Sequence, residues 1–356
     1  MLNLVYPSAA TMKEIDADLT VRSRANRLGF QLFPVEEETT FQVRWIQKDN
    51  YYGLMAMRGI DGAPPKVQRV GENSFVYEPG VYGENVVITE RELLMRSVPN
   101  RPDIPIPVTD LVTEAQMQLT QRKDDRVEAN VFSLLSTGTL SIPLPGPNGV
   151  IAYKDAYTFQ TITASVPWAT AATATPLLNF QQAQQLQIGH GVDFGAAATA
   201  YMNQFTANLL LNNANASDFG GRRNQFGATI NDLAAFNNYF AGQNLPKIQV
   251  YDQGYQPNPI SGPITTPSSQ FIKFIPDHTV IIVGRRPGNT PVGAFKQTLQ
   301  AMQPGAAPSP GAYSFIKDYA RGINAPLEVP PKLEVHEGFN GGLVMYYQNS
   351  VIVMTV

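Results

Sequence analysis

The sequence predicts an α+β protein organised around one long helix and one extended β-ribbon. Residues 108–137 contain neither glycine nor proline and are rich in good helix formers. From Thr39 onward the hydrophobic period changes to two, as in half-buried strands. Prolines within residues 101–107 keep the chain extended before the helix, and Gly138 can take the left-handed conformation that ends it. Such a helix spans roughly 40 Å.

The N-terminal part is expected to form an arm and then the ribbon. Residues 1–35 show no clean period and predict an arm that lies on something other than its own core. Phe41, Val43 and Trp45 alternate with polar residues, and extended runs return at 74–77 and 86–89. An isolated two-stranded ribbon is marginally stable in water. We therefore expect it to pack on another subunit.

The long helix has apolar stripes at both ends and a wholly polar centre. We expect it to lie across a surface and to pack only at intervals. The centre reads either as a solvated helix face or as an ion network between subunits, and both readings stay open. Asp124 and Asp125 are adjacent, and adjacent helix positions do not face each other, so they do not form an acid/base pair. The charged residues of this centre are Arg122, Lys123, Asp124, Asp125 and Arg126.

After the helix the pattern alternates between strands and helices. A strand is expected within residues 151–159, and helices within 181–187, 193–211 and 229–240. Two strands, at 332–336 and 343–356, close the chain. This mixture supports the α+β class rather than a repeated βα pattern.

Composition limits the class of function. The 356 residues are 43% hydrophobic but only 15% charged, with a net charge of −3, which disfavours a strongly basic nucleic-acid binder. A surface poor in charge suits a protein that covers much of its exterior with copies of itself. Cysteine is absent, so disulfides and cysteine-ligated metals are excluded. With no secretory signal and no membrane-length apolar run, the chain is expected to be soluble and intracellular at synthesis.

No group of residues predicts catalysis, and no cofactor or metal is expected. The three histidines are far apart, and Glu334 two positions before His336 is a weak ligand pair. Phosphate-binding and nucleophile-elbow motifs are missing from the sequence. Two basic doublets read either as exposed loop charges or as salt bridges across a subunit contact: Arg222 with Arg223, and Arg285 with Arg286.

Taken in order, these segments resemble the major capsid proteins of tailed bacteriophages, specifically the lambda-type family with the Hong Kong 97 fold. The resemblance rests on residues 75–94, on 122–138 with the strand after it, and on 250–252 followed by 274–284. It implies an N-terminal arm at 1–35, an extended loop at 36–98, a peripheral domain with a spine helix, and an axial domain. The peripheral domain would comprise 99–167 and 326–356, its spine helix 108–137, and the axial domain 168–325.

The resemblance implies a coat subunit that assembles into pentamers and hexamers of an icosahedral shell around double-stranded DNA. Expected partners are a separate scaffolding protein, a portal and a decoration protein, with non-specific DNA contacts and no membrane. Its location would be the virion, after assembly in the host cytoplasm. Some family members crosslink the shell through a lysine and an asparagine; Lys66 lies where that lysine is expected, but no partner asparagine is identified. The residues expected at subunit interfaces are Lys66, Arg69, Glu72, Arg122, Lys123, Asp124, Asp125, Arg126, Arg222, Arg223, Arg285 and Arg286.

Two other readings are kept. One is an enzyme or binding module that works through residues 168–325, with a pocket near Asp277, His278 and Arg285. The other is a different virion component, such as a tail-tube or decoration subunit, which shares the composition but does not need the long helix.

Overall fold

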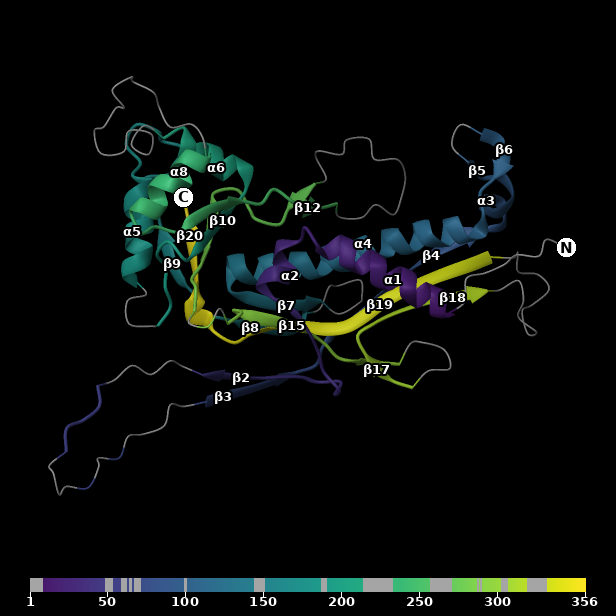
Figure 1. Ribbon diagram of the computed structural model, residues 1–356, viewed down its shortest axis with the longest axis horizontal. Helices are drawn as coiled ribbons and strands as arrows, with labels where there is room; N and C mark the ends of the chain where they lie inside the picture. The colour runs from purple at the N-terminus through teal and green to yellow at the C-terminus, as the bar shows by residue number, and fades with distance from the viewer. Residues whose placement is uncertain are drawn as a thin grey trace.

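The computed structural model describes residues 9–48, 54–58, 63, 66, 72–98, 101–143, 151–186, 191–213, 233–256, 271–286, 288, 290–301, 307–318 and 332–356. Over these residues the fold is α+β, as the sequence predicts, with α4 lying along a curved sheet and a second layered body at one end (Figure 1). The helices are α1 (Ala9–Arg24), α2 (Leu28–Leu32), α3 (Glu90–Met95), α4 (Val108–Thr137), α5 (Pro176–Leu186), α6 (Gln204–Leu211), α8 (Leu233–Gly242) and a 3-10 turn (Gln348–Ser350). None of the described helices is long and apolar enough to cross a membrane.

The first sheet has one long central strand. The strand β19 pairs with β15 and β18 along one edge and with β4 along the other, and β1 extends the sheet beyond β15. Apolar side chains of α4 pack on this sheet in the same cluster as Phe295, Phe339 and Leu343. The strands are β1 (Val35–Glu37), β4 (Gly80–Thr89), β15 (Gly293–Gln297), β18 (Ala312–Asp318) and β19 (Lys332–Met345).

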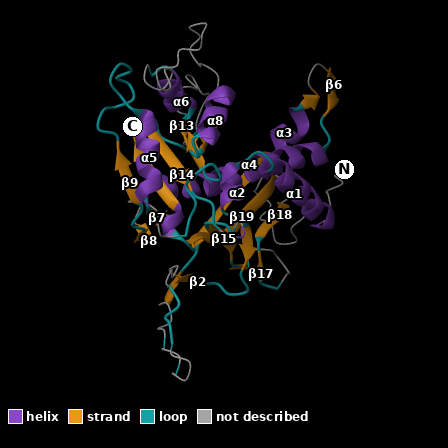
Figure 2. Cartoon of the chain, turned by 60° about the vertical axis from the view of Figure 1, so that its left-hand side comes forward, coloured by secondary structure: helices purple, strands orange, loops and turns teal. Residues whose placement is uncertain are grey.

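The second sheet is the centre of a separate core at the other end of the molecule. Its order is β11-β10-β14-β20-β9, and α5, α6 and α8 pack beside it (Figure 2). Val280, Ile282 and Ile352 are fully buried in it. The strands are β9 (Gln160–Thr163), β10 (Thr199–Met202), β11 (Lys247–Val250), β14 (Thr279–Val283) and β20 (Val351–Thr355).

Strand pairing joins segments on both sides of the predicted domain boundaries, which stay predictions. The last two strands lie in different sheets: β19 belongs to the first sheet, and β20 lies in the second sheet between β14 and β9. Conversely, β15 and β18 come from the segment 168–325 but pair with β19. The segment 193–211 is also not one helix: β10 precedes α6, which begins where the Asn203 side chain accepts the Thr206 N–H at 2.8 Å.

Short hairpins project from this frame. The ribbon, which we define as β2, β3 and residues 54–58 between them, confirms the predicted pairing of the 41–45 and 74–77 runs. The run at 86–89 is not part of it, because β4 pairs with β19 over ten residues. The hairpin strands are β2 (Val43–Lys48), β3 (Glu72–Tyr77), β5 (Ser97–Val98), β6 (Arg101–Pro105), β7 (Thr139–Pro143), β8 (Ile151–Ala156), β12 (Gly254–Tyr255), β13 (Ile272–Lys273), β16 (Leu299–Gln300) and β17 (Ser309–Pro310).

The helix α4 has the bounds that the sequence predicts. It spans Val108–Thr137 and ends at Gly138, whose φ of 70° is left-handed. The apolar stripes at its two ends are buried, but so is one face of its centre, through Thr120, Lys123 and Asp124, so the expectation of packing only at intervals is wrong. The reason is that other elements supply polar partners for the central side chains.

Replacing Gly138 by alanine is expected to lower the free energy of unfolding by about 1–3 kcal/mol, because a side chain is strained at positive φ. Its Cβ would also lie 2.6 Å from the Tyr157 carbonyl oxygen. Gly242→Ala is the matched control, since no atom lies within 4 Å of its added Cβ. Urea unfolding should show little or no loss for the control, and equal losses in both variants would contradict this account.

Candidate assembly surface

A row of buried polar side chains runs along one face of α4. Residues 116, 120, 124 and 128 follow one another at intervals of four, and residue 123 lies three positions after 120, so all five lie on the same side of the helix. All are at most 7% exposed, and a buried polar group is tolerated only when it is paired. We call this row the polar seam; it consists of Gln116, Thr120, Lys123, Asp124 and Glu128.

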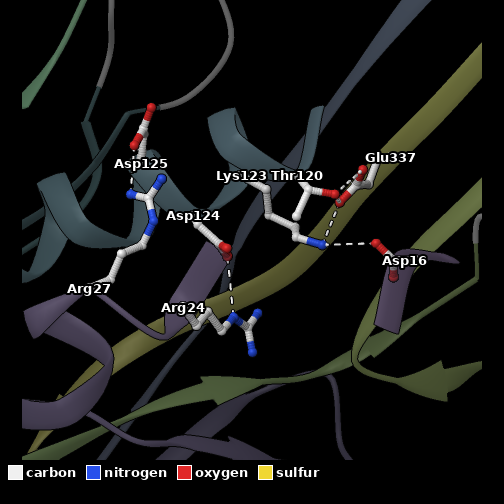
Figure 3. Close-up of polar contacts among 8 residues, drawn as sticks. All are labelled: Asp16, Arg24, Arg27, Thr120, Lys123, Asp124, Asp125 and Glu337. Carbon is white, nitrogen blue, oxygen red and sulfur yellow. Dashed lines mark hydrogen bonds and ion pairs between the residues drawn. The ribbon is translucent and has the colours of Figure 1, made fainter. Parts of the chain in front are cut away.

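At the centre of the polar seam, the Lys123 ammonium lies between two carboxylates (Figure 3). Its Nζ is 3.4 Å from Asp16 Oδ1 of α1 and forms a second ion pair with Glu337 of β19. The Thr120 hydroxyl donates to the same Glu337 carboxylate at 3.1 Å. One charge on α4 therefore joins α1 to the first sheet.

Burial shifts the titration of this group. It raises the pKa of Glu337 to about 7, although the Lys123 ammonium acts in the opposite direction. Burial also lowers the pKa of Lys123, but the Glu337 and Asp16 carboxylates outweigh it, so the net pKa is raised. Lys123 is therefore charged at neutral pH, while Glu337 changes its charge near neutrality.

The free energy of unfolding is expected to fall as the pH rises from 4.5 to about 7, because folded Glu337 holds its proton more tightly than in the unfolded chain. The stabilisation from Glu337 has its full value below pH 4.5, which is the pKa of this group in the unfolded chain. It is lost above a pH of about 7, which is its pKa in the folded chain. At about 1.4 kcal/mol per pKa unit it is on the order of 3 kcal/mol. Urea unfolding across this range should give a smaller pH slope for Glu337→Gln.

The control is Glu114→Gln, which removes an exposed carboxylate paired with Arg96. It should leave the pH slope unchanged. A Glu337→Gln slope equal to that of the unaltered chain would show that Glu337 does not carry the effect.

The N-terminal segment also lies on the polar seam. Arg24 Nε is 3.3 Å from Asp124 Oδ1, and Arg27 donates to Asp125 Oδ1 at 2.6 Å (Figure 3). In addition, Leu28 and Phe33 are buried in the main core. The expectation that residues 1–35 lie away from their own core is therefore wrong for the described part of that segment.

Glu128 joins three elements at the end of the polar seam. Its Oε1 accepts the Gly29 N–H of α2 at 2.9 Å and also the Tyr251 hydroxyl, which follows β11. Burial raises the pKa of Glu128, against the effect of both hydrogen bonds. A Cβ at Gly29 would lie 2.4 Å from Glu128 Oε2, so the close approach of α2 requires glycine here.

The sequence predicts that the charged helix centre is solvated or paired with another subunit. The structure corrects this for Lys123 and Asp124, which are buried and paired within the chain. Arg122 pairs with Glu84 of β4, with 2.7 Å between Nη2 and Oε1, and both side chains are partly exposed. Asp125 is also partly exposed and Arg126 is exposed, so contacts with a neighbouring subunit stay a prediction for these three positions.

The base of the ribbon is fixed to the first sheet. Trp45 stacks on Phe75 with 4.9 Å between centroids, and the Tyr77 hydroxyl donates to the Leu343 carbonyl at 2.8 Å. Gly342 allows this contact, since a Cβ there would lie 2.0 Å from the Tyr77 hydroxyl oxygen. Lys296 Nζ donates to the Arg44 carbonyl at 2.8 Å. These contacts fix the base of the ribbon beside β15 and β19 of the first sheet.

Farther from the body, the ribbon carries apolar side chains without cover. Leu54, Met55 and Met57 are 101%, 99% and 96% exposed, and Figure 1 shows the ribbon projecting away from both sheets. Ile46 and Val76 are also half exposed on the strands. Scattered apolar side chains are ordinary on a surface, but a contiguous exposed group marks an interaction site. The sequence signal for this exposed group is the apolar run at residues 54–57, which lies within a polar segment rich in turn residues.

The remaining predicted interface residues are dispersed. Lys66, between residues 54–58 and β3, and Glu72 of β3 are exposed, whereas Arg69, Arg222 and Arg223 lie outside the described residues. The exposed Arg285 pairs through its backbone with Asp193, and the Arg286 guanidinium lies 3.4 Å from the Tyr347 ring centroid. No described contact brings these positions together.

The residues considered for a pocket form surface interactions instead. Asp277 accepts from Asn203 at 2.6 Å and pairs with Lys273 at 3.0 Å, and His278 packs edge-on against Phe205. Burial by itself raises the pKa of Asp277. The hydrogen bonds from Lys273 and Asn203 together have a larger opposite effect, so the pKa of Asp277 lies below its usual value. This pattern is typical of a surface ion pair.

The predicted weak ligand pair is a local contact on β19. His336 Nε2 is 3.2 Å from Glu334 Oε2, and Lys332 pairs with the same carboxylate at 2.7 Å. Phe315 stacks on His336 with centroids 4.8 Å apart. Among the described residues, no cluster of three or more metal-ligating side chains is present.

The sequence matches no family model, and no curated protein is similar to it in sequence. Solved structures are similar at low identity. A prophage protein of Escherichia coli CFT073, assigned as a capsid protein, has a TM-score of 0.58 at 14% identity, covering 97% of this chain and 98% of that one. A phage-related protein of Bordetella bronchiseptica RB50 has a TM-score of 0.52 at 11% identity, covering 95% and 96%.

The chain has a Hong Kong 97-like fold. The predicted fold is thereby confirmed, since the similarity extends over nearly the whole of both chains. The lambda-type assignment and the domain boundaries stay predictions. Within the Hong Kong 97-like fold, α4 is the long helix that carries the polar seam, and the ribbon is its most exposed apolar feature.

Proposed function

We propose that the chain is the major capsid protein of a tailed bacteriophage. Copies of it would assemble into pentamers and hexamers of an icosahedral shell that encloses double-stranded DNA. The single observation that carries this proposal is the ribbon, whose Leu54, Met55 and Met57 are almost fully exposed in one chain. Burying an apolar side chain of this size contributes about 1.5–3 kcal/mol, so three of them favour a partner strongly.

The partner is a second copy of the same chain. Trp45 and Tyr77 fix the ribbon base to the first sheet. Leu54, Met55 and Met57 lie beyond that base without cover. A contact between this exposed group and a different surface on the next copy is heterologous, and heterologous contacts close into rings when the rotation allows it. The low charge content of the chain supports extensive burial of its surface between copies.

The finer parts of the proposal rest on the sequence resemblance. Lys66, Glu72, Arg122, Asp125 and Arg126 would lie at contacts between copies, all of them at least partly exposed in the single chain. Scaffolding, portal and decoration proteins would be separate partners, and the DNA would be contacted without sequence specificity. The protein would reside in the virion shell after assembly in the host cytoplasm.

Negative-stain electron microscopy and sedimentation test this proposal. The chain is expressed alone and also together with its neighbouring genes. Rings of five and six subunits, or closed icosahedral particles, are the expected result. A uniform population of compact monomers in both preparations would overturn it.

A further inference from the structure

The helix α1 is attached to the body in a different way from α2. Among the described side chains of α1, Met12 is the fully buried apolar one at 2% exposed, whereas Val21 is 70% exposed. The short segment that follows α1 contributes Leu28 and Phe33 to the main core. Met12 packs with Leu111 and Leu119 of α4, so among the described side chains one fully buried apolar residue anchors α1, whereas the segment after α1 enters the main core.

Beyond Met12, polar contacts hold α1 on the body. Asp16 pairs with Lys123 at 3.4 Å, and Arg24 pairs with Asp124 at 3.3 Å. The Gln116 amide donates to the Met12 carbonyl at 3.4 Å. Residues 25–27 separate α1 from α2; Ala25 and Asn26 are exposed, whereas Arg27 is buried. All three contacts end on the polar seam of α4.

When α1 leaves, it withdraws Met12 from its apolar cluster and uncovers the polar seam, and the polar seam can be solvated by water. Lys123 keeps its ion pair with Glu337, and Thr120 keeps its hydrogen bond to the same carboxylate. Asp124 would exchange Arg24 for water. Exposing groups that hydrogen-bond water costs far less than exposing an equal apolar area. Elements with few buried apolar contacts open at lower free energy than the core.

We propose that α1 is a strap, which opens as a unit about residues 25–26 while α2 and the two sheets stay folded. The opening uncovers the polar seam and frees α1 to contact another molecule. This device goes beyond the proposed capsid role, because it is a property of the single chain and operates with or without assembly.

Hydrogen exchange of the full-length chain, measured by mass spectrometry on unassembled subunits, tests the strap. Backbone amides of residues 9–24 are expected to exchange at least about tenfold faster than those of α4 and β19, through an opening of their own. Asp16→Asn and Arg24→Gln should each speed exchange of residues 9–24 by about fivefold or more while α4 is unchanged.

Two matched controls lie on the same helix. Asp18 and Arg22 pair with each other at 2.8 Å on the exposed side of α1, so Asp18→Asn and Arg22→Gln remove equal charges without touching α4. They should change the exchange of residues 9–24 by less than about twofold. The strap is overturned if residues 9–24 and α4 exchange together in every variant, or if the control substitutions act as strongly as Asp16→Asn and Arg24→Gln.

Discussion

Replacing Lys123 by methionine is expected to lower the free energy of unfolding by about 3–5 kcal/mol. The substitution leaves the buried Glu337 carboxylate without its cation and removes the partner of Asp16, so Glu337 must either take up a proton or remain as an uncompensated buried charge. Urea unfolding of unassembled subunits at neutral pH measures the loss. The double variant Lys123→Met with Glu337→Leu should recover most of it, because it removes both buried charges.

Lys273→Met is the matched control. Lys273 also lies between two carboxylates, Asp277 at 3.0 Å and Asp252 at 3.9 Å, but all three side chains are about a third to a half exposed. Exposed pairs contribute at most about 1 kcal/mol. If Lys123→Met costs no more than Lys273→Met, burial of the polar seam does not stabilise the chain as described.

Replacing Leu54, Met55 and Met57 together by aspartate is expected to abolish assembly and to leave the subunit folded. Each side chain is almost fully exposed, so the free energy of unfolding should change by no more than about 0.5 kcal/mol. Losing three buried anchors from an interface removes more than about 4 kcal/mol, which corresponds to a change of about a thousandfold in the association constant. Sedimentation and particle counts by electron microscopy measure the assembly.

Leu178→Asp on α5 is the control for the ribbon variant. Leu178 is a single apolar side chain that is 52% exposed, and it does not belong to a contiguous apolar group like the ribbon's. Its substitution should leave particle yield within about twofold. Normal particles from the ribbon variant would show that the exposed apolar group is not an assembly contact.

The bounds of α4 and the two ribbon strands could be predicted from the sequence, because each depends on residues within the segment itself. The helix α4 begins after Pro107 and ends at Gly138, because proline and glycine act on the backbone at their own positions. The two ribbon strands followed from alternation. The run at 86–89 is β-branched throughout and also predicts a strand, yet it pairs with β19, because residue types that favour a strand do not specify which strand is its neighbour.

The polar seam could not be predicted from sequence, because its partners are distant in the chain. The residues that pair with Asp124 and Thr120 lie 100 and 217 positions away. Without those partners the charged helix centre reads as a solvated surface. The separation of β19 from β20 is missed for a similar reason, since both are apolar strands and only tertiary pairing assigns each to its sheet.

The positions of β19 and β20 have a consequence for biosynthesis. Chains are made from the N-terminus, so these two strands emerge from the ribosome after every other described strand. Until then the first sheet lacks the strand that joins β4 to β15 and β18, and the second lacks the strand between β14 and β9. The ribbon is already synthesised at that stage, but its anchoring carbonyl at Leu343 is not. A product that terminates before Lys332 therefore completes neither sheet, and unfinished chains cannot present a correctly directed ribbon.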